Sequence, residues 1–408
     1  MKYVNIIPLI GGMTLANKSV VKSDPYEVLS YDAFHNNEKH LLNYLPNLNY
    51  KIINDDLNEI IEDVEFVSTV CPCAGLSMLN SEGKSNKKRG GDAVQNEWMY
   101  KTANYVLSNL HPKVFWGENA PGLYTNLGLK VVENFKEIAK KFGYSLSIVK
   151  TSTILHGIPQ DRIRSFYFFW KSDKAPILNY YNKEYKDFLS YINEVKNIES
   201  HSKDFMVDKK PSEWFLPYKF VLNRLGLNHK EFVELNQKLK FPTVFIYIDK
   251  NNLWDELIDW LKVNDQKITD KSKNSFLSIV LHIKSKLNQG KGYWDNSPHF
   301  PLNGKINALI GKNMYRLVHP EEDRFLNIRE MLHLMGLPND FTISDIKDIN
   351  HIAQNVPVTT AADFTNEVVK FINGKLKLSE YNFLKQNEIK QKIEYYENFK
   401  NEECTVSE

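Results

Sequence analysis

The sequence predicts an α/β fold. In the first 170 residues, short apolar strand candidates alternate with helical stretches, and this alternation is typical of βαβ units around a parallel sheet. The chain has 408 residues, of which 42% are hydrophobic and 12% aromatic, so it can bury a sizeable core. At roughly 150 residues per domain, this length predicts two or three domains.

The composition narrows the class of protein. The three cysteines Cys71, Cys73 and Cys404 are too few for a disulfide framework, so we expect a cytoplasmic protein. No run of about 18 apolar residues is present, and we expect no membrane span. The formal net charge is +2, which leaves nucleic-acid binding open, because such proteins often place basic residues locally. Frequent Lys, Asn and Ile suggest a bacterial, phage or mobile-element origin.

Seven strands are predicted in the first part of the chain, together with one clear amphipathic helix. The helix carries Val131, Phe135, Ile138 and Phe142 on one face, the spacing of a helix packed on a sheet. The predicted strands are Val4–Leu9, Glu27–Tyr31, Lys51–Ile53, Glu65–Val70, Lys113–Trp116, Ser145–Lys150 and Ser165–Trp170.

Unusual residues follow several of these strands. In open α/β sheets the ligand site lies beyond the carboxyl ends of the strands. Those places hold Gly11-Gly12, Asp32, Cys71-Pro72-Cys73 and Glu118-Asn119. We therefore expect the functional site at this edge.

The pattern changes after residue 170. We predict a catalytic domain over 1–170, an inserted domain over 171–324, and returning helices with a charged, helical tail over 325–408. The insert holds a predicted strand at Thr243–Asp249, a predicted helix at Leu253–Val263 and a loop at Gly290–Trp294.

The segment Val70-Cys-Pro-Cys-Ala-Gly-Leu-Ser77 places a cysteine after a strand, in a small-residue loop. A catalytic cysteine needs partial exposure and nearby positive charge. A buried structural cysteine is the alternative. A zinc site through Cys71 and Cys73 is disfavoured, because zinc takes four ligands and the remaining cysteine lies in the tail. We predict no metal.

Two further motifs carry charge. Trp116-Gly-Glu-Asn-Ala-Pro-Gly122 places a carboxyl group at a strand end, where partial burial would raise its pKa and let it act as an acid. In Gly157-Ile-Pro-Gln-Asp-Arg-Ile-Arg164 the residues Gln160, Arg162 and Arg164 alternate, so an extended segment places them on one face. Solvated side chains are the alternative in both cases.

The chain closes with Phe325-Leu-Asn-Ile-Arg-Glu-Met-Leu-His-Leu-Met-Gly-Leu-Pro338 and Ile352-Ala-Gln-Asn-Val-Pro-Val358. Taken alone, each motif is typical of a structural helix or loop rather than of a functional site. In their order, the Gly-Gly loop and these motifs resemble the carbon-5 cytosine DNA methyltransferase family. The resemblance implies a Rossmann-like, S-adenosylmethionine-dependent methyltransferase fold, with a mixed sheet and an inserted target-recognition domain.

The resemblance also implies roles for the motif residues. Cys73 matches the nucleophile that attacks carbon 6 of a flipped cytosine, and Glu118 matches the residue that hydrogen-bonds or protonates ring nitrogen 3. Arg162 and Arg164 match the arginines that hold the base and the catalytic loop, whereas Asn119 matches a structural brace. The implied substrates are double-stranded DNA and S-adenosyl-L-methionine.

The family implies a cofactor site and a DNA-contacting surface as well. Gly11, Gly12, Asp32, Asp56 and Asn355 match the cofactor site, although Asp55 competes with Asp56. A mobile loop at Asn80–Asp92 is expected to close over the flipped base. The predicted DNA contacts are Ser77, Lys84, Lys87, Lys88, Arg89, Gln160, Gly292 and Tyr293.

The sequence departs from the family pattern in the cofactor loop. The usual aromatic-x-Gly-x-Gly reads Ile7-Pro-Leu-Ile-Gly11, so the aromatic and one glycine are missing. Ala74, Leu76 and Ala353 replace a Gln, a Phe and a Gly. These changes concern cofactor affinity and loop motion more than the chemistry.

Two other functions compete with DNA methylation. The same chemistry on RNA is disfavoured by the long insert, which carries target recognition in the DNA enzymes. A non-catalytic DNA-binding relative is disfavoured by the intact set of Cys73, Glu118, Arg162 and Arg164. We expect a monomer, with a cognate restriction endonuclease as a candidate partner.

Overall fold

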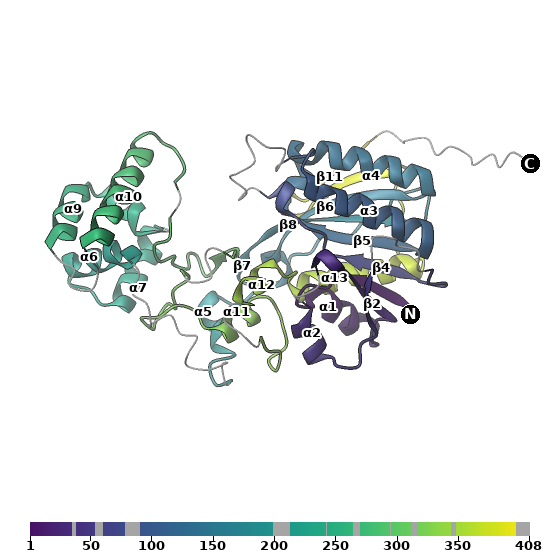
Figure 1. Cartoon of the computed structure of the whole chain (residues 1–408), viewed down its shortest axis with the longest axis horizontal. Coiled ribbons are helices and arrows are strands. Elements are labelled where there is room, and N and C mark those ends of the chain that lie inside the picture. Colours follow the sequence, from purple (N-terminus) through teal and green to yellow (C-terminus); the bar gives the residue numbers. More distant parts are fainter. Residues whose placement is uncertain are drawn as a thin grey trace, which may run out of the picture. The chain divides into compact units, whose positions relative to one another are not determined.

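The computed structural model describes residues 1–34, 38–53, 60–77, 90–198, 213–241, 243–263, 270–293, 295–311, 316–343 and 348–396. The chain divides into two compact units (Figure 1). The first comprises Met1–Tyr185, Leu332–Ser344 and Gln354–Glu408, and the second comprises Lys186–Met331 and Asp345–Ala353.

A mixed sheet forms the centre of the first unit. Its strand order in the described chain is β11-β10-β6-β8-β5-β4-β1-β2-β3. The strands from β3 to β5 pair in parallel, whereas β8 runs antiparallel to both β5 and β6. The bounds are β1 Tyr3–Ile6, β2 Glu27–Tyr31, β3 Tyr50–Ile53, β4 Phe66–Thr69, β5 Val114–Asn119, β6 Ser145–Ser152, β8 Ile163–Trp170, β10 Phe383–Asn387 and β11 Lys392–Tyr395. All seven strands predicted from the first part of the sequence are confirmed.

Helices cover both faces of this sheet, because the strands are apolar on both sides. Alternation along β8 sends Phe166, Phe168 and Trp170 into one core and Tyr167 and Phe169 into the other, as expected for strands buried on both faces. Helices α1 (Gly12–Val21) and α13 (Val358–Ile372) pack in the first core. Helices α3 (Glu97–Tyr105) and α4 (Leu129–Phe142) pack in the second.

The predicted helix at Val131–Phe142 is confirmed as α4, which buries Val131, Phe135 and Ile138. It ends at Gly143, whose φ of 71° suits the left-handed cap that closes a helix. The amino-terminal region also contains helix α2 (Lys39–Tyr44).

The helical tail was a wrong prediction for the part of it that the structure describes, up to residue 396; residues 397–408 lie outside the described chain. Residues Phe383–Asn387 form β10, which pairs in parallel with β6, and β11 then pairs antiparallel with β10. The apolar Phe383 and Leu384 are buried there. Gln386 exchanges two hydrogen bonds with the backbone of Leu178, at 2.8 and 2.9 Å. Pairing with the open edge of β6 thus makes a strand of a segment whose local composition is polar.

The second unit is mainly helical. Its helices bury a core rich in aromatic residues, which includes Trp214, Phe232, Phe245 and Trp254. Helix α7 begins with a capping box between Asn228 and Glu231. The bounds are α5 Phe188–Asn193, α6 Leu216–Leu225, α7 His229–Leu239, α8 Val244–Lys250, α9 Trp254–Val263 and α10 Asp270–Asn288. Two short strands, β7 (Gln160–Asp161) and β9 (Ile306–Asn307), and helices α11 (Ile328–His333) and α12 (Ile349–Gln354) complete the fold.

The predicted strand at Thr243–Asp249 is also wrong, since Val244–Lys250 forms helix α8. Its buried residues are Val244, Phe245, Tyr247 and Ile248, a spacing that places them on one helical face. Packing of this face in the helical core overrides the strand preference of the β-branched and aromatic residues. The predicted helix in the same region is confirmed as α9.

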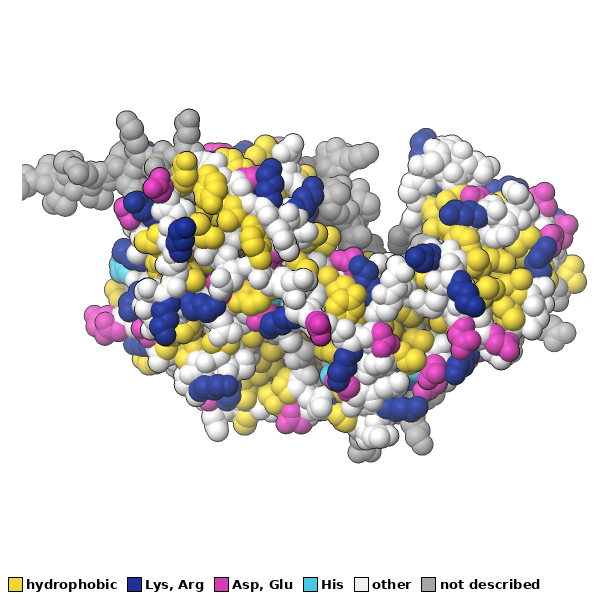
Figure 2. Space-filling model, turned by 180° about the vertical axis from the view of Figure 1, so that it is seen from behind, with side chains coloured by type: hydrophobic (Ala, Val, Ile, Leu, Met, Phe, Trp, Pro, Cys, Tyr) yellow, Lys and Arg dark blue, Asp and Glu magenta, His cyan; other side chains and the backbone are white. Residues whose placement is uncertain are grey.

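Within the described part of the chain, no helix combines the length and apolar character needed to cross a membrane. On the face seen in Figure 2, Lys and Arg side chains lie scattered among apolar and acidic ones. This distribution agrees with the small net charge of the chain.

Candidate active site

The register of the sheet brings the charged motifs to one edge. Strand β4 pairs in parallel with β5, with Thr69 opposite Gly117, so Cys73, just after β4, and Glu118, near the end of β5, lie at the same edge of the sheet. Strand β8 is antiparallel to β5, with Ser165 opposite Asn119. The start of β8, which carries Arg164, therefore lies at the carboxyl ends of β4 and β5.

Glu118 forms a buried ion pair at this edge. Its Oε1 lies 2.8 Å from Nε of Arg164, and the residue is only 4% exposed. Burial raises the pKa of Glu118, while the charges of Arg164 and Arg162 partly offset this rise. A share of the carboxyl group therefore stays protonated at higher pH than usual, as an acid catalyst requires.

Cys73 is an exposed residue, although protein atoms surround its thiol. Cys73 precedes a short 3-10 helix at Ala74–Leu76. Desolvation raises the pKa of the thiol, and the negative charge of Glu118 adds to that rise. Arg164 and Arg162 act in the opposite direction. Four predicted site residues thus interact electrostatically in the structure.

The neighbouring Cys71 differs from Cys73. It is buried, and its sulfur contacts Oγ1 of Thr69 at 3.6 Å and Oγ1 of Thr102 at 3.7 Å. Burial raises the pKa of the Cys71 thiol. Only one of the two cysteines in the motif is therefore accessible to a substrate.

Arg162 connects the charged edge to the loop before α13. It is 1% exposed, and its Nη2 donates to the carbonyl oxygen of Asn355 at 3.0 Å. Burial and the nearby Arg164 lower the pKa of Arg162 to about 9, although Glu118 and Cys73 favour its charged form. At neutral pH it remains a cation held inside the protein.

Asn119 and Asn96 hold the backbone next to the site through hydrogen bonds. Asn119 Oδ1 accepts from the backbone N–H of Ala120 at 2.9 Å, and its Nδ2 lies 3.2 Å from the sulfur of Met99. Asn96 donates to the carbonyl oxygens of Gly90 and Gly91, at 2.8 and 3.1 Å. The N–H of Gly90 in turn donates to Gly75 O at 2.7 Å. Asn96 was not predicted, because its role depends on this chain reversal rather than on a motif.

The loop between β1 and α1 has an unusual backbone. Ile7 and Leu9 have φ values of 54° and 53°, in the left-handed region that normally favours glycine. Leu9 occupies a position where the resembled family has glycine. Gly11 also has a positive φ, of 108°. The backbone at Leu9 therefore has a conformation that is typical of glycine, although the residue is a leucine.

Gly12 fits tightly against a distant segment. Its N–H donates to Oδ1 of Asn355 at 2.9 Å. A Cβ added at Gly12 would lie 2.1 Å from the carbonyl oxygen of Val356 and 2.5 Å from Nδ2 of Asn355. No larger residue fits here without displacement of the backbone.

Comparisons with known proteins decide the family. The model of the C-5 cytosine-specific DNA methylase family matches residues 10–370. The chain belongs to this family. It is a DNA cytosine-5 methyltransferase.

Individual relatives agree with this assignment. The chain is 23% identical to the type II methyltransferase M.FnuDI of Fusobacterium nucleatum, over 96% of this chain and 99% of that protein. It is 21% identical to the type II methyltransferase M.Bpa9945I of Bacillus paralicheniformis, over 74% of this chain and 69% of that protein.

Solved structures share the fold. A DNA modification methyltransferase described from prophage Cp- of E. coli superposes with a TM-score of 0.55 at 12% identity, covering 91% of this chain and 99% of that one. The Entamoeba histolytica methyltransferase EhMeth gives a TM-score of 0.52 at 10% identity, covering 91% and 98%. At such identities, these likenesses concern the fold alone.

Methyltransferases of this family use S-adenosylmethionine, and the loop after β1 suits such a group. Gly11 and Gly12 lead into the amino terminus of α1, where backbone N–H groups favour polar ligands. Nδ2 of Asn355 is buried without a hydrogen-bond partner among the described residues. Asp32 is exposed directly after β2. Asp56 and its competitor Asp55 lie outside the described residues.

The predicted DNA contacts of the methyltransferase lie in different settings. Gln160 is fully buried and donates to Leu334 O at 2.8 Å, so it would reach DNA only after this bond breaks. Tyr293 is half-buried, with its hydroxyl 3.2 Å from Oγ1 of Thr243. Gly292 is exposed in open space, and Ser77 is half-buried. Lys84, Lys87, Lys88 and Arg89 lie outside the described residues.

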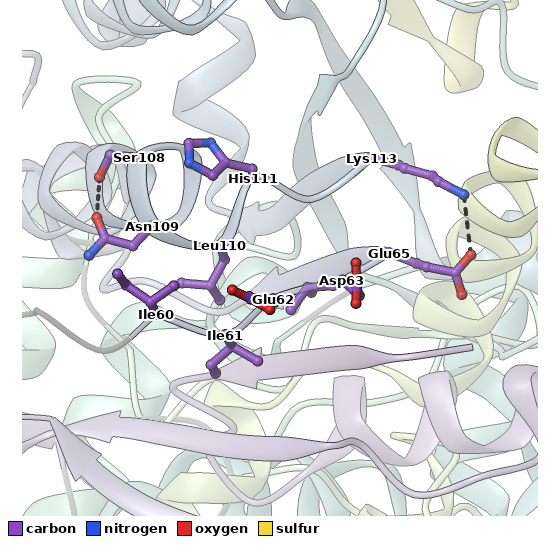
Figure 3. A pocket seen from close by; sticks show the side chains of 11 residues that line it. Ile60, Ile61, Glu62, Asp63, Glu65, Ser108, Asn109, Leu110, His111 and Lys113 are labelled. Atoms are coloured by element: carbon purple, nitrogen blue, oxygen red, sulfur yellow. Dashed lines mark hydrogen bonds and ion pairs between the residues drawn. The ribbon is translucent and has the colours of Figure 1, made fainter.

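A cavity of about 850 Å³ lies away from this edge. Its lining combines residues 60–65, at the start of β4, with residues 108–111 and Lys113, at the start of β5 (Figure 3). Lys113 Nζ and Glu65 Oε1 are 3.3 Å apart. Because strands β4 and β5 begin here, the cavity faces the opposite edge of the sheet from Glu118.

Proposed function

We propose that the protein transfers a methyl group to carbon 5 of a cytosine flipped out of duplex DNA, through a covalent adduct with Cys73. The supporting observation is the exposed residue Cys73, whose thiol lies within the electrostatic reach of Glu118, Arg162 and Arg164. Inside a duplex, carbon 6 of cytosine is shielded by stacking, so the base must leave the helix to meet a thiolate.

Cys73 begins the reaction as a thiolate. Its sulfur bonds to carbon 6, and the electrons of the ring double bond move to carbon 5, which becomes nucleophilic. The raised pKa of the free thiol means that deprotonation accompanies binding and attack. Arg162 and Arg164 favour the thiolate, since both lower the pKa of Cys73.

Glu118 acts on the opposite side of the ring. A carboxyl group with a raised pKa can donate a proton or a hydrogen bond to ring nitrogen 3. That donation neutralises the negative charge that the sulfur brings into the ring. Arg164, paired with Glu118 at 2.8 Å, fixes the direction of the carboxyl group.

Gly11, Gly12, Asp32 and Asn355 would hold S-adenosylmethionine, which supplies an electrophilic methyl group to carbon 5 when bound. Transfer of the carbon-5 proton to water and departure of Cys73 as a thiolate then restore the aromatic ring. No metal takes part in these steps. The relatives named type II methyltransferases suggest that a restriction endonuclease with the same target accompanies the enzyme.

The second unit is the proposed target-recognition domain. It falls largely within the insert predicted over 171–324, between the catalytic motifs and the closing segment. Replacement of this insert by that of a relative with a different target is expected to change the methylated sequence. An unchanged sequence would contradict the assignment.

The decisive test traps the covalent adduct. With S-adenosylmethionine present, methyl transfer to 5-fluorocytosine leaves fluorine on carbon 5, where a proton would normally be lost, so the Cys73 adduct accumulates and shifts on a denaturing gel. We expect the shifted band with wild type and with Cys404→Ala, and its loss with Cys73→Ala. Methyl transfer by Cys73→Ala should fall by about 1000-fold or more. A band that persists in Cys73→Ala would refute the mechanism.

A further inference from the structure

A side chain of the C-terminal strands reaches the segment that follows Glu118. Strand β5 ends at Asn119, and a short 3-10 helix then spans Pro121–Tyr124. This helix is called the 121–124 turn below. Lys385 lies in β10, and its Nζ donates to the carbonyl oxygen of Tyr124 at 3.0 Å. A residue 261 positions away in the sequence therefore holds the end of the turn.

The 121–124 turn also contacts other parts of the charged edge. Ser165, near the start of β8, donates its hydroxyl to the carbonyl oxygen of Pro121 at 3.4 Å. Gly122 lies against the loop of Cys73, since a Cβ added at Gly122 would lie 2.2 Å from the carbonyl oxygen of Leu76. The N–H of Leu76 in turn donates to Cys73 O at 3.1 Å. The turn is thus linked both to the cysteine loop and to β8.

Lys385 is an unusual residue for its position in the sheet. It is 7% exposed, and burial lowers the pKa of its ammonium group. Burial of a cation costs free energy, so packing alone would favour an apolar side chain at this position of β10. The carbonyl oxygen of Tyr124 and its ring, whose centroid lies 5.0 Å from Nζ, offset part of this cost. Both contacts come from the last residue of the 121–124 turn.

A second lysine near β10 offers a comparison. Lys136 in α4 lies over the ring of Phe383, with its Nζ 4.6 Å from the ring centroid, and it pairs with Glu133 at 2.9 Å. Within the described residues, its ion pair and ring contacts involve α4 and the C-terminal segment, not the 121–124 turn. The two lysines therefore share a cation–aromatic setting, but Lys385 alone of this pair contacts the turn.

We propose that Lys385 is a positioning residue for methyl transfer. Its hydrogen bond to Tyr124 O fixes the 121–124 turn, and the turn keeps Glu118 in place beside Cys73. Lys385 touches no reacting atom and acts through Glu118, whose proton or hydrogen bond must meet the ring nitrogen in a narrow range of geometries. The inference rests on the proposed function, since it takes Glu118 as the acid.

Lys385→Met tests the hydrogen bond, because methionine is similar in length and donates no hydrogen bond. We expect kcat for methyl transfer to fall about tenfold, while KM for S-adenosylmethionine and for duplex DNA changes by less than about twofold. Urea melts establish that the variant is folded. Lys385→Gln is made in parallel, since its side chain is one bond shorter and falls short of Tyr124 O. The same expectations apply if only this variant folds.

Two comparisons separate positioning from stability. Lys136→Met is the matched control and should keep the wild-type kcat, because it removes a neighbouring lysine without a contact to the turn. In a Glu118→Gln protein, Lys385→Met should lower kcat by less than about twofold, since the group that it positions is already lost. A purely structural role would lower kcat by the same factor in both backgrounds.

Alkylation of Cys73 by iodoacetamide gives a readout that does not depend on methyl transfer. Burial and the charge of Glu118 raise the pKa of the Cys73 thiol, while Arg164 and Arg162 lower it. If the carboxyl group is released in Lys385→Met, the alkylation profile should shift to lower pH. Failure to trap a Cys73 adduct would defeat the proposed function, but this profile would still report whether Lys385 holds Glu118 beside Cys73.

Three results would overturn the inference. The first is a folded Lys385→Met or Lys385→Gln protein with either a wild-type kcat or a wild-type alkylation profile. The second is an equal loss of kcat in the wild-type and Glu118→Gln backgrounds. The third is a loss in Lys136→Met as large as in Lys385→Met, which would assign the effect to packing of the C-terminal strands.

Discussion

The charged edge around Glu118 and the loop after β1 lie in the same unit but are built on different principles. At the charged edge, side chains set one another's protonation, since Glu118, Arg162 and Arg164 all shift the pKa of Cys73. In the loop, close packing of the backbone limits which residues fit, because a Cβ added at Gly12 would lie only 2.1 Å from Val356 O.

This difference predicts two kinds of mutational effect. Substitutions at the charged edge that keep the shape of the side chain should change reactivity more than packing, because they alter charge and leave the volume almost unchanged. Substitutions in the loop should change affinity or stability according to the room around each residue. The following predictions test this division, from the largest expected effect to the smallest.

Glu118→Gln is expected to lower methyl transfer by about 100-fold or more, because an amide cannot supply the acid's proton. It should also raise the reactivity of Cys73, since Glu118 raises the pKa of that thiol. Alkylation of Cys73 by iodoacetamide, followed by peptide mass spectrometry from pH 6 to 9, should shift to lower pH. Glu133→Gln, an exposed glutamate of α4, is the control. An unchanged alkylation profile would break the proposed coupling.

His156→Gln tests whether a charge cluster apart from the four charged-edge residues serves stability alone. His156 Nδ1 lies 2.8 Å from Asp363 Oδ2, and its Nε2 lies 2.9 Å from Thr151 Oγ1 and 3.4 Å from Glu388 Oε2. Burial lowers the pKa of His156, but Asp363 and Glu388 outweigh it, so the net pKa is raised.

A raised pKa stabilises the folded state below the unfolded value of about 6.5, and this contribution disappears as the pH rises through the folded pKa. We therefore expect His156→Gln to lower the free energy of unfolding by roughly 3 kcal/mol near pH 6, and by less at pH 9. Urea melts should show this trend, with the exposed His282→Gln unaffected. A larger deficit at pH 9 would reverse the sign and disprove the assignment.

Gly12→Ala is expected to weaken S-adenosylmethionine binding by about tenfold or more, since the added methyl group must displace the backbone at Val356. Isothermal titration calorimetry measures the change. Gly292→Ala is the matched control, because no atom lies within 4 Å of a Cβ placed there. Equal affinities for both variants would show that the loop adapts.

Leu9→Gly should change the free energy of unfolding least, by under about 1 kcal/mol. Relief of the left-handed backbone gains about 1 kcal/mol, and loss of the half-buried side chain costs a similar amount. Leu29→Gly in β2, where the leucine is fully buried, should cost several kcal/mol. Thermal melts of both variants provide the comparison, and similar losses would show that the backbone at Leu9 is unstrained.

The sequence predicts the sheet well because its signal is local. Strands such as Glu27–Tyr31 are short, buried and bounded by polar residues, and α4 repeats its apolar positions at helical spacing. The meeting of Cys73 with Glu118 was predictable for a related reason, since carboxyl ends of parallel strands share one edge. Their catalytic roles remain predictions.

The failures share a nonlocal cause. The apolar run at Val244–Ile248 is too short to distinguish a strand from a helix without its packing partners. Strand β10 depends on Gln386 meeting Leu178 and on Lys385 donating to Tyr124 O at 3.0 Å, contacts that span more than 200 residues. The pairing of His299 with Arg316 was not predicted either, because the fold alone brings these two residues together.

Strand β10 has a consequence for biosynthesis. Leu146 N–H in β6 donates to Asn382 O at 2.8 Å, so an early strand waits for a partner made more than 200 residues later. Until that partner leaves the ribosome, β6 presents an unpaired edge that invites aggregation. The nascent chain is therefore prone to aggregate during this interval unless the edge of β6 is covered or synthesis is fast. Pairing of β10 with β6 should be a slow, late step that limits the folding rate.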